Sequence, residues 1–200
     1  MKHVNRYVNE NQVQTRDKNA DRQIGDKLHR IYFYDCPPIA KCHHNPISKR
    51  AIDFAKSDES VFRLSLHHKL KKMRKVALRL GTLSEGDWVI RPSATTELLK
   101  GKRTYDSLTE YDVALDIRQK GVDMRIGIDI ASLAYKQQVK QIVLIAGDAD
   151  FIPAAKLARR EGIDFVLDSM WKAIPEELHE HIDGLWSTFR RPNESSDPQY

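Results

Sequence analysis

The chain has 200 residues, of which 40% are apolar, and this is enough for one domain with a hydrophobic core. Its net charge of +5 fits an anionic partner, although many ordinary soluble proteins carry a similar excess. With only two cysteines, Cys36 and Cys42, the chain is not a disulfide scaffold, and a reducing compartment is the simpler interpretation. No apolar run approaches the length of a membrane span and no secretory signal is found, so we expect a cytoplasmic protein without membrane contact.

The first elements in chain order are one strand and one helix. Residues 1–29 are polar, and residues 30–34 then read as a strand rich in aromatic and β-branched residues. A loop is expected to about Lys56, followed by a helix over roughly 59–78 that Asp58 would cap. The middle of the chain gives weaker signals.

In that middle part, residues 88–90 read as a short strand and 93–103 as a loop or a short turn of helix. Residues 105–118 carry mixed helical signals. The remaining predicted elements are a helix over 122–135, a strand at 141–146, a helix at 153–160, a strand at 164–167 and a helix within 174–186. Strands that alternate with helices predict a parallel α/β sheet, and the composition of residues 188–200 predicts a disordered tail.

The most informative segment places two acids, Asp148 and Asp150, directly after the apolar strand at 141–146. Open α/β sheets build their sites at the carboxyl ends of the strands. Two like charges this close are costly without a cation, which favours a divalent metal over the simpler interpretation that Asp150 only caps the next helix. Magnesium suits such a site because it takes oxygen ligands and keeps several waters.

Three further acids could join this edge, and each has a structural alternative. Asp35 follows the first strand but could only shape a turn, and Asp123 could only complement a helix dipole. Asp129 lies four residues after Arg125, so an ion pair within the helix would explain it. Taken alone, the structural interpretation is preferred for Asp35 and Asp129 and is about even for Asp123.

Several motifs occur in a fixed order along the chain. The most specific combination is Lys120-Gly121-Val122-Asp123 followed by Gly147-Asp148-Ala149-Asp150-Phe151 at this separation. The other pieces are Tyr34-Asp35 with Pro37-Pro38, Ile47-Ser48 with Ile52-Asp53-Phe54, Arg79-Leu80-Gly81, Ile128-Asp129-Ile130-Ala131 and Ala158-Arg159-Arg160-Glu161-Gly162. With these motifs the chain resembles bacterial NYN domains of the LabA-like group, in the PIN-like nuclease superfamily.

The resemblance covers roughly residues 30–185 and implies an NYN domain at 30–187 with a Rossmann-like three-layer α/β/α sandwich and a mostly parallel sheet. It also implies metal-dependent cleavage of RNA. Carried over by motif, Asp123, Asp148 and Asp150 would surround Mg²⁺ or Mn²⁺, and Asp129 falls on the second helical acid of the family. Lys120 falls on the motif lysine and could meet a substrate phosphate.

The start of the chain departs from the family pattern. Family members begin with a strand that ends in an acid, and residues 1–29 contain no apolar run that could be such a strand. Residues 1–7 read like the inside of the family's first helix. Either the natural start lies upstream of Met1, which we favour, or the first strand and its acid have been lost; an incomplete sheet edge would favour a homo-oligomer.

Basic and aromatic residues outside these motifs give weaker signals. Lys100, Lys102 and Arg103 form a loop-borne cluster that could contact substrate. Trp171 could stack a base, although core packing or a rim contact is the preferred interpretation. Substrate contacts are therefore assigned to Lys120, Lys102 and Arg103, with Asp35 as a weaker member of the site.

The leading hypothesis is a metal-dependent endoribonuclease acting on single-stranded RNA, in which catalysis depends on Asp148, Asp150, Asp123 and Asp129. Bound cations would activate a water and stabilise the leaving oxygen of a phosphodiester. The alternative is a non-catalytic RNA- or protein-binding regulatory module of the same fold. A phosphatase using the same acidic edge ranks last because the chain lacks the usual aspartyl-nucleophile pattern.

Overall fold

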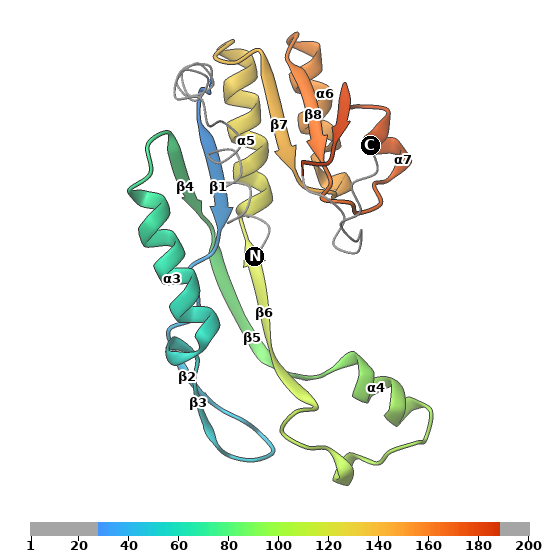
Figure 1. Cartoon of the computed structure of the whole chain (residues 1–200). Coiled ribbons are helices and arrows are strands. Elements are labelled where there is room, and N and C mark those ends of the chain that lie inside the picture. Colours follow the sequence, from blue (N-terminus) through green and yellow to red (C-terminus); the bar gives the residue numbers. More distant parts are fainter. Residues whose placement is uncertain (1–27, 189–200) are drawn as a thin grey trace, which may run out of the picture. The chain divides into compact units, whose positions relative to one another are not determined.

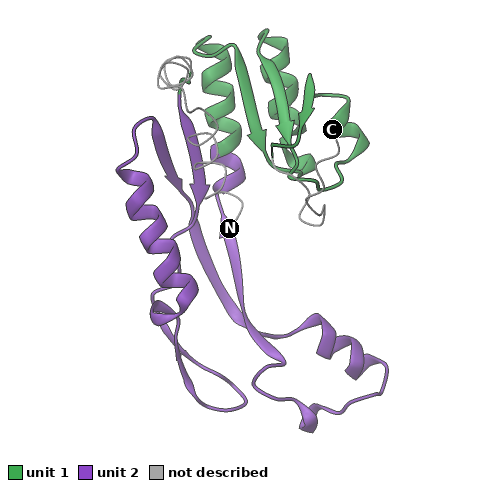
Figure 2. Ribbon diagram, viewed as in Figure 1, with its two compact units in different colours: residues 1–29, 126–200 green, residues 30–125 purple. Residues whose placement is uncertain are grey.

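The computed structural model describes residues 28–188. These residues fall into two compact units, drawn in different colours in Figure 2: unit 2 is residues 30–125, and the described part of unit 1 is residues 28–29 and 126–188. Both units contain helices and strands, which confirms the predicted mixed α/β class. The predictions for the N-terminal segment and for the tail lie almost wholly outside the described residues.

Unit 2 contains a parallel pair of strands, β1 (Ile31–Asp35) and β4 (Val76–Leu80). Helix α3 (Asp58–Lys71) makes the crossover between them. The helix buries Leu66 and Leu70, which lie one turn apart on the same face. This strand–helix–strand unit places Asp35 at the carboxyl end of β1.

A small antiparallel hairpin, β2 (Cys42–His44) and β3 (Ala51–Asp53), lies inside this crossover and is followed by the short helix η1 (Phe54–Lys56). The prediction of a loop up to Lys56 is therefore wrong. The hairpin is too short to show a period in the sequence, since each strand has three residues.

A long antiparallel hairpin, β5 (Thr82–Ile90) and β6 (Val113–Lys120), completes the strands of unit 2 (Figure 1). Thr82 pairs with Lys120 at one end and Ile90 with Val113 at the other. Residues 91–112 connect the strands at that second end and are called the tip below. The tip contains α4 (Pro92–Leu99) and η2 (Tyr105–Ser107).

Three further predictions for unit 2 need correction. The helix predicted over 59–78 ends at Lys71, and the residues after Lys75 form β4, because Lys75 turns the chain with a φ of 62° and the next residues pair with β1. The cap is Ser57, whose side chain accepts from the backbone N–H of Ser60. Residues predicted to carry helical signals at 105–118 instead supply most of β6.

Unit 1 contains a parallel sheet with the strand order β7 (Gln141–Ile145), β8 (Asp164–Asp168) and β9 (Gly184–Trp186). Helix α5 (Val122–Tyr135) begins in unit 2 and enters unit 1 at Ile126. The predicted bounds of α5 and the predicted strands β7 and β8 are confirmed to within one residue.

The core of unit 1 is centred on β8, where Phe165, Val166 and Leu167 are almost fully buried. A central parallel strand is covered on both faces, and this explains the unbroken apolar run. Two helices complete the unit, α6 (Ile152–Arg160) and α7 (Glu176–His179).

The helix predicted within 174–186 is confirmed as α7, which Pro175 caps, and Gly184–Trp186 form the additional strand β9, which was not predicted. The strand forms there because Asp183 bonds to the start of β8: its Oδ2 accepts from the backbone N–H of Phe165 at 2.8 Å. Among residues 28–188, no helix has the length and apolar character that a membrane crossing requires.

Candidate functional site

The acidic pair lies at the carboxyl end of β7 in unit 1, as predicted. Asp148 caps the short helix η3 (Ala149–Phe151), and its Oδ1 accepts from the backbone N–H of Asp150 at 3.1 Å. Phe151 is buried and ties this turn to the core, and Pro153 in the first turn of α6 sets the direction of the following helix. The sequence Gly-Asp-Ala-Asp-Phe-Ile-Pro therefore builds a hydrogen-bonded turn that presents two carboxylates.

Both carboxylates of the pair are exposed to solvent. Within the described residues, neither Asp148 nor Asp150 has an ion pair, and Asp148 Oδ2 has no hydrogen-bond donor. Two exposed carboxylates without an ion pair fit a magnesium-type ion, which proteins bind through one or two carboxylates together with waters and substrate phosphates. Across residues 28–188 there is no group of three or more His, Cys, Asp or Glu side chains arranged to hold a metal.

The two predicted acids of α5 lie on different faces of that helix. Asp123 is in its first turn and is exposed, whereas Asp129 is partly buried about 1.7 turns later. Arg125 donates from Nη1 to the carbonyl oxygen of Gly121 at 2.9 Å and so closes the start of the helix. Asp123 belongs to unit 2 and Asp129 to unit 1, and both assignments to the site stay predictions.

Lys120 is exposed at the end of β6, beside the left-handed residue Gly121 with its φ of 77°. The connection between β4 and β5, at Gly81, packs tightly against the backbone of Lys120. A methyl group on Gly81 would lie 2.7 Å from the carbonyl oxygen of Lys120 and 2.8 Å from Val122 Cγ2. The absence of a side chain at Gly81 therefore allows the backbone that carries Lys120 to approach this closely.

Asp35 ends β1, but its carboxylate is engaged by two side chains from α3. Arg63 Nη1 donates to Oδ1 at 2.9 Å, and His67 Nε2 lies 2.9 Å from Oδ2. The His67 side chain is only 5% exposed and that of Asp35 13%. These contacts give Asp35 a structural task between β1 and α3, so its proposed substrate contact needs an independent test.

The two basic residues predicted to contact substrate lie in the tip and differ from each other. The Lys102 side chain is exposed and forms no hydrogen bond or ion pair in the described part of the chain. Arg103 forms a bidentate pair with Asp112, at 3.0 Å and 2.8 Å, and reaches Glu97 and the carbonyl oxygen of Ser107. Arg103 therefore links α4, η2 and the start of β6.

This pair shifts the pKa values of both partners. The Arg103 guanidinium, with help from the backbone N–H and hydroxyl of Thr109, holds the pKa of the Asp112 carboxyl well below its usual range. Asp112 and Glu97 in turn raise the pKa of Arg103. The tip is thus held by charge-assisted hydrogen bonds.

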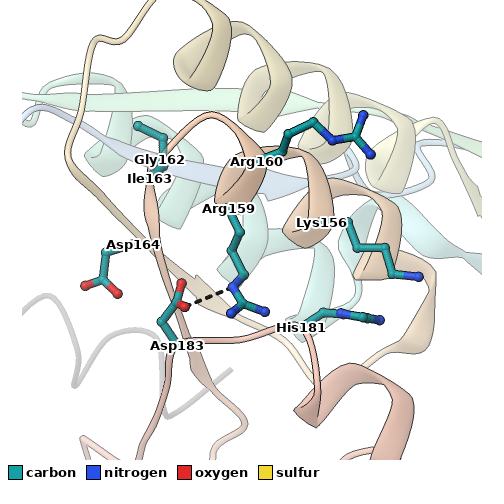
Figure 3. A pocket seen from close by; sticks show the side chains of 8 residues that line it. All are labelled: Lys156, Arg159, Arg160, Gly162, Ile163, Asp164, His181 and Asp183. Carbon is teal, nitrogen blue, oxygen red and sulfur yellow. Dashed lines mark hydrogen bonds and ion pairs between the residues drawn. The ribbon is translucent and has the colours of Figure 1, made fainter.

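A pocket of about 730 Å³ occurs in unit 1 (Figure 3). It lies at the opposite edge of the sheet from the acidic pair. Its walls come from the end of α6, the start of β8 and the segment before β9. Lys156, Arg159 and His181 line it, and Arg159 is paired with Asp183 at 2.9 Å. Because the amino ends of the strands form this edge, the pocket does not belong to the predicted site.

Two residues that the sequence prediction missed lie at the carboxyl edge with the acidic pair. Asp168 ends β8, in register with Ile145 at the end of β7, and its carboxyl group is fully buried. Lys172 follows in the next turn, and its Cβ is 3.9 Å from the position that a Cβ of Gly147 would occupy. The signal that found Asp148, an acid at a strand end, also applies to Asp168.

The comparisons with known proteins give one match. The model of one protein family, the NYN domain, matches residues 66–185. This range contains β4, the long hairpin, α5 and all of the parallel sheet of unit 1 except the last residue of β9. No curated protein and no solved structure matches the chain.

Proposed function

The chain belongs to the NYN domain family, within the PIN-like superfamily, and from this membership we propose that it is a metal-dependent endoribonuclease. The family indicates a nuclease-like function related to RNA. Metal dependence, hydrolysis and the LabA-like assignment go further and are part of the proposal.

The single observation that carries the proposal is the exposed acidic pair on a hydrogen-bonded turn at the carboxyl edge of a parallel sheet. Asp148 and Asp150 would hold Mg²⁺ or Mn²⁺, with Asp123 and Asp129 as further acids. The bound ion would polarise a phosphodiester oxygen and lower the pKa of a water. The two carboxylates would fix the position of the ion, and substrate phosphate would fill the remaining ligand positions.

The substrate contacts in this proposal come from exposed basic residues. Lys120 at the base of the hairpin and Lys102 in the tip would each meet a phosphate of single-stranded RNA. Arg103 would act by holding the tip, because its guanidinium is already engaged by Asp112.

The test is cleavage of a labelled single-stranded RNA with added Mg²⁺ or Mn²⁺, comparing the wild-type chain with Asp148→Asn. We expect the wild-type chain to cut the RNA only when metal is present. Cutting by the Asp148→Asn chain should be slower by at least ~10–100-fold, the loss that removing a supporting residue of a metal site causes. Asp164→Asn is the matched control, because it removes one exposed carboxylate charge from the same unit at the opposite edge.

Equal cutting by the Asp148→Asn chain and the wild type would overturn the assignment of the acidic pair. If the wild-type chain binds RNA but does not cut it, the alternative function, a regulatory module that binds RNA, would be favoured over the enzyme.

A further inference from the structure

The turn that joins β8 to the following segment has an unusual backbone. The N–H of Lys172 donates to the carbonyl oxygen of Ser169 at 3.0 Å, and this closes a four-residue β-turn. Its two central residues, Met170 and Trp171, have φ values of 50° and 65°. Turns with positive φ at both central positions are normally built from Gly, Asn or Asp.

A Met–Trp pair in this conformation is strained, and such strain persists only where the surroundings hold it. Here the buried Asp168 supplies the support. Its Oδ1 accepts from the N–H of Met170 at 2.9 Å, and its Oδ2 accepts from the hydroxyl and N–H of Thr188 at 2.6 Å and 3.3 Å. A fully buried carboxylate thus holds a strained turn at the edge of the sheet where the acidic pair lies.

The turn sets the position of two side chains suited to RNA. Lys172 is exposed and lies beside Gly147, the residue before Asp148. Its side chain forms no hydrogen bond or ion pair with any other residue in the range 28–188. Trp171 is 43% exposed, a large fraction for an indole.

We propose that the turn at 169–172 is a substrate-positioning element, in which Lys172 binds the RNA phosphate next to the acidic pair and Trp171 stacks on a base. The proposal rests on the proposed function, since it names the contacts of that same site. Lysine neutralises a phosphate without a fixed geometry, and aromatic stacking accepts any base. The pairing of these two side chains therefore favours single-stranded RNA with little sequence preference.

The experiment measures binding separately from cleavage. A short fluorescein-labelled single-stranded RNA is titrated with the full chain carrying Asp148→Asn, in the presence of a chelator, and its anisotropy is followed. Lys172→Ala is expected to weaken binding about tenfold, as the loss of a charge-assisted hydrogen bond would. Lys172→Arg should keep most of the affinity, and Lys156→Ala, which removes one exposed charge at the opposite edge, should change it by less than about twofold.

Trp171 needs a second readout, because its replacement could also alter folding. Trp171→Gly relieves the backbone strain at a positive φ but also removes the packing of the indole, so the melting temperature of this variant is measured alongside its affinity for RNA, which should fall several-fold. A fall in melting temperature with unchanged affinity would show that Trp171 has only a structural role.

The outcomes separate this proposal from the proposed function. Equal effects of Lys172→Ala and Lys156→Ala, in a chain whose wild type cuts RNA, would overturn the positioning element and leave the nuclease intact. Binding that depends on Lys172, in a chain whose wild type does not cut, would overturn the nuclease and support the positioning element. A chain that neither binds nor cuts RNA overturns both.

Discussion

The contacts of the Asp35 side chain indicate a structural role for this residue. Its carboxylate bridges Arg63 and His67, and all three side chains are largely buried. Asp35→Asn keeps the shape but removes the charge, so we expect a loss of about 1–3 kcal/mol in the free energy of unfolding. Urea unfolding followed by circular dichroism measures this.

The matched control for that substitution is Asp106→Asn, because Asp106 is exposed in η2 and its change should stay within about 0.5 kcal/mol. Unchanged stability together with lost RNA cleavage would instead place Asp35 in the site and contradict the structural role.

Glycines give a second test at the same scale. Gly81→Ala would force a methyl group against the backbone of Lys120 and the side chain of Val122, so we expect a loss of about 1–3 kcal/mol and weaker RNA binding through Lys120. Gly127 lies inside α5, and within residues 28–188 a methyl group added to it would meet no atom within 4 Å beyond its chain neighbours and the nearby backbone of its own helix. Gly127→Ala should therefore stabilise the chain by up to about 1 kcal/mol.

Thermal unfolding of the two variants compares them directly. A Gly81→Ala chain as stable as the Gly127→Ala chain would show that the β4–β5 connection can relax and does not fix Lys120.

Among the elements, those that the sequence predicts well are the ones whose signals are local. Helix α5 shows apolar residues at helical spacing, and β7 is a short apolar run followed by Gly147 and Asp148. Strand β4 carries no such signal, because it continues the spacing of α3 and becomes a strand only by pairing with β1. The same holds for β6 and β9, which pair with β5 across residues 91–112 and with β8 across residues 169–183.

The candidate site divides in the same way. Asp148 and Asp150 are found from seven consecutive residues, whereas the position of Lys172 depends on two positive φ values that nothing in Met170-Trp171 predicts. Arg103 was expected to face substrate, yet its guanidinium pairs with Asp112, which the fold of the tip brings back to it.

The tip is the element whose stability should respond to acid. The pKa of Asp112 is lowered in the folded chain, so the stabilisation by its pair with Arg103 is complete above the ordinary value of 3.8 and is lost as pH falls through the lower folded value. We expect the backbone NMR signals of residues 91–112 to move towards unfolded positions in that acid range, while those of β8 do not.

Asp112→Asn supplies the check on this prediction. It should loosen the tip already at neutral pH and remove the acid transition. A transition that persists in the Asp112→Asn chain would assign it to another carboxyl group.

For the whole molecule, the proposed RNA contacts are distributed over both units, with Lys172 in unit 1 and Lys120 and Lys102 in unit 2. The salt dependence of binding depends on the number of such contacts and not on how they are arranged, because each neutralised phosphate releases counterions. Three phosphate contacts on a single strand predict a slope of about −2 in a plot of log affinity against log salt concentration.

Removing one contact should lower the magnitude of that slope by about 0.7 as well as the affinity itself. Lys102→Ala and Lys172→Ala are each expected to do so, and the double variant should lose about twice as much, since sites without shared partners act independently. Lys156→Ala, with the same loss of net charge, should leave the slope unchanged. Equal slopes for all of these chains would mean that the net charge of +5 attracts RNA without defined phosphate contacts.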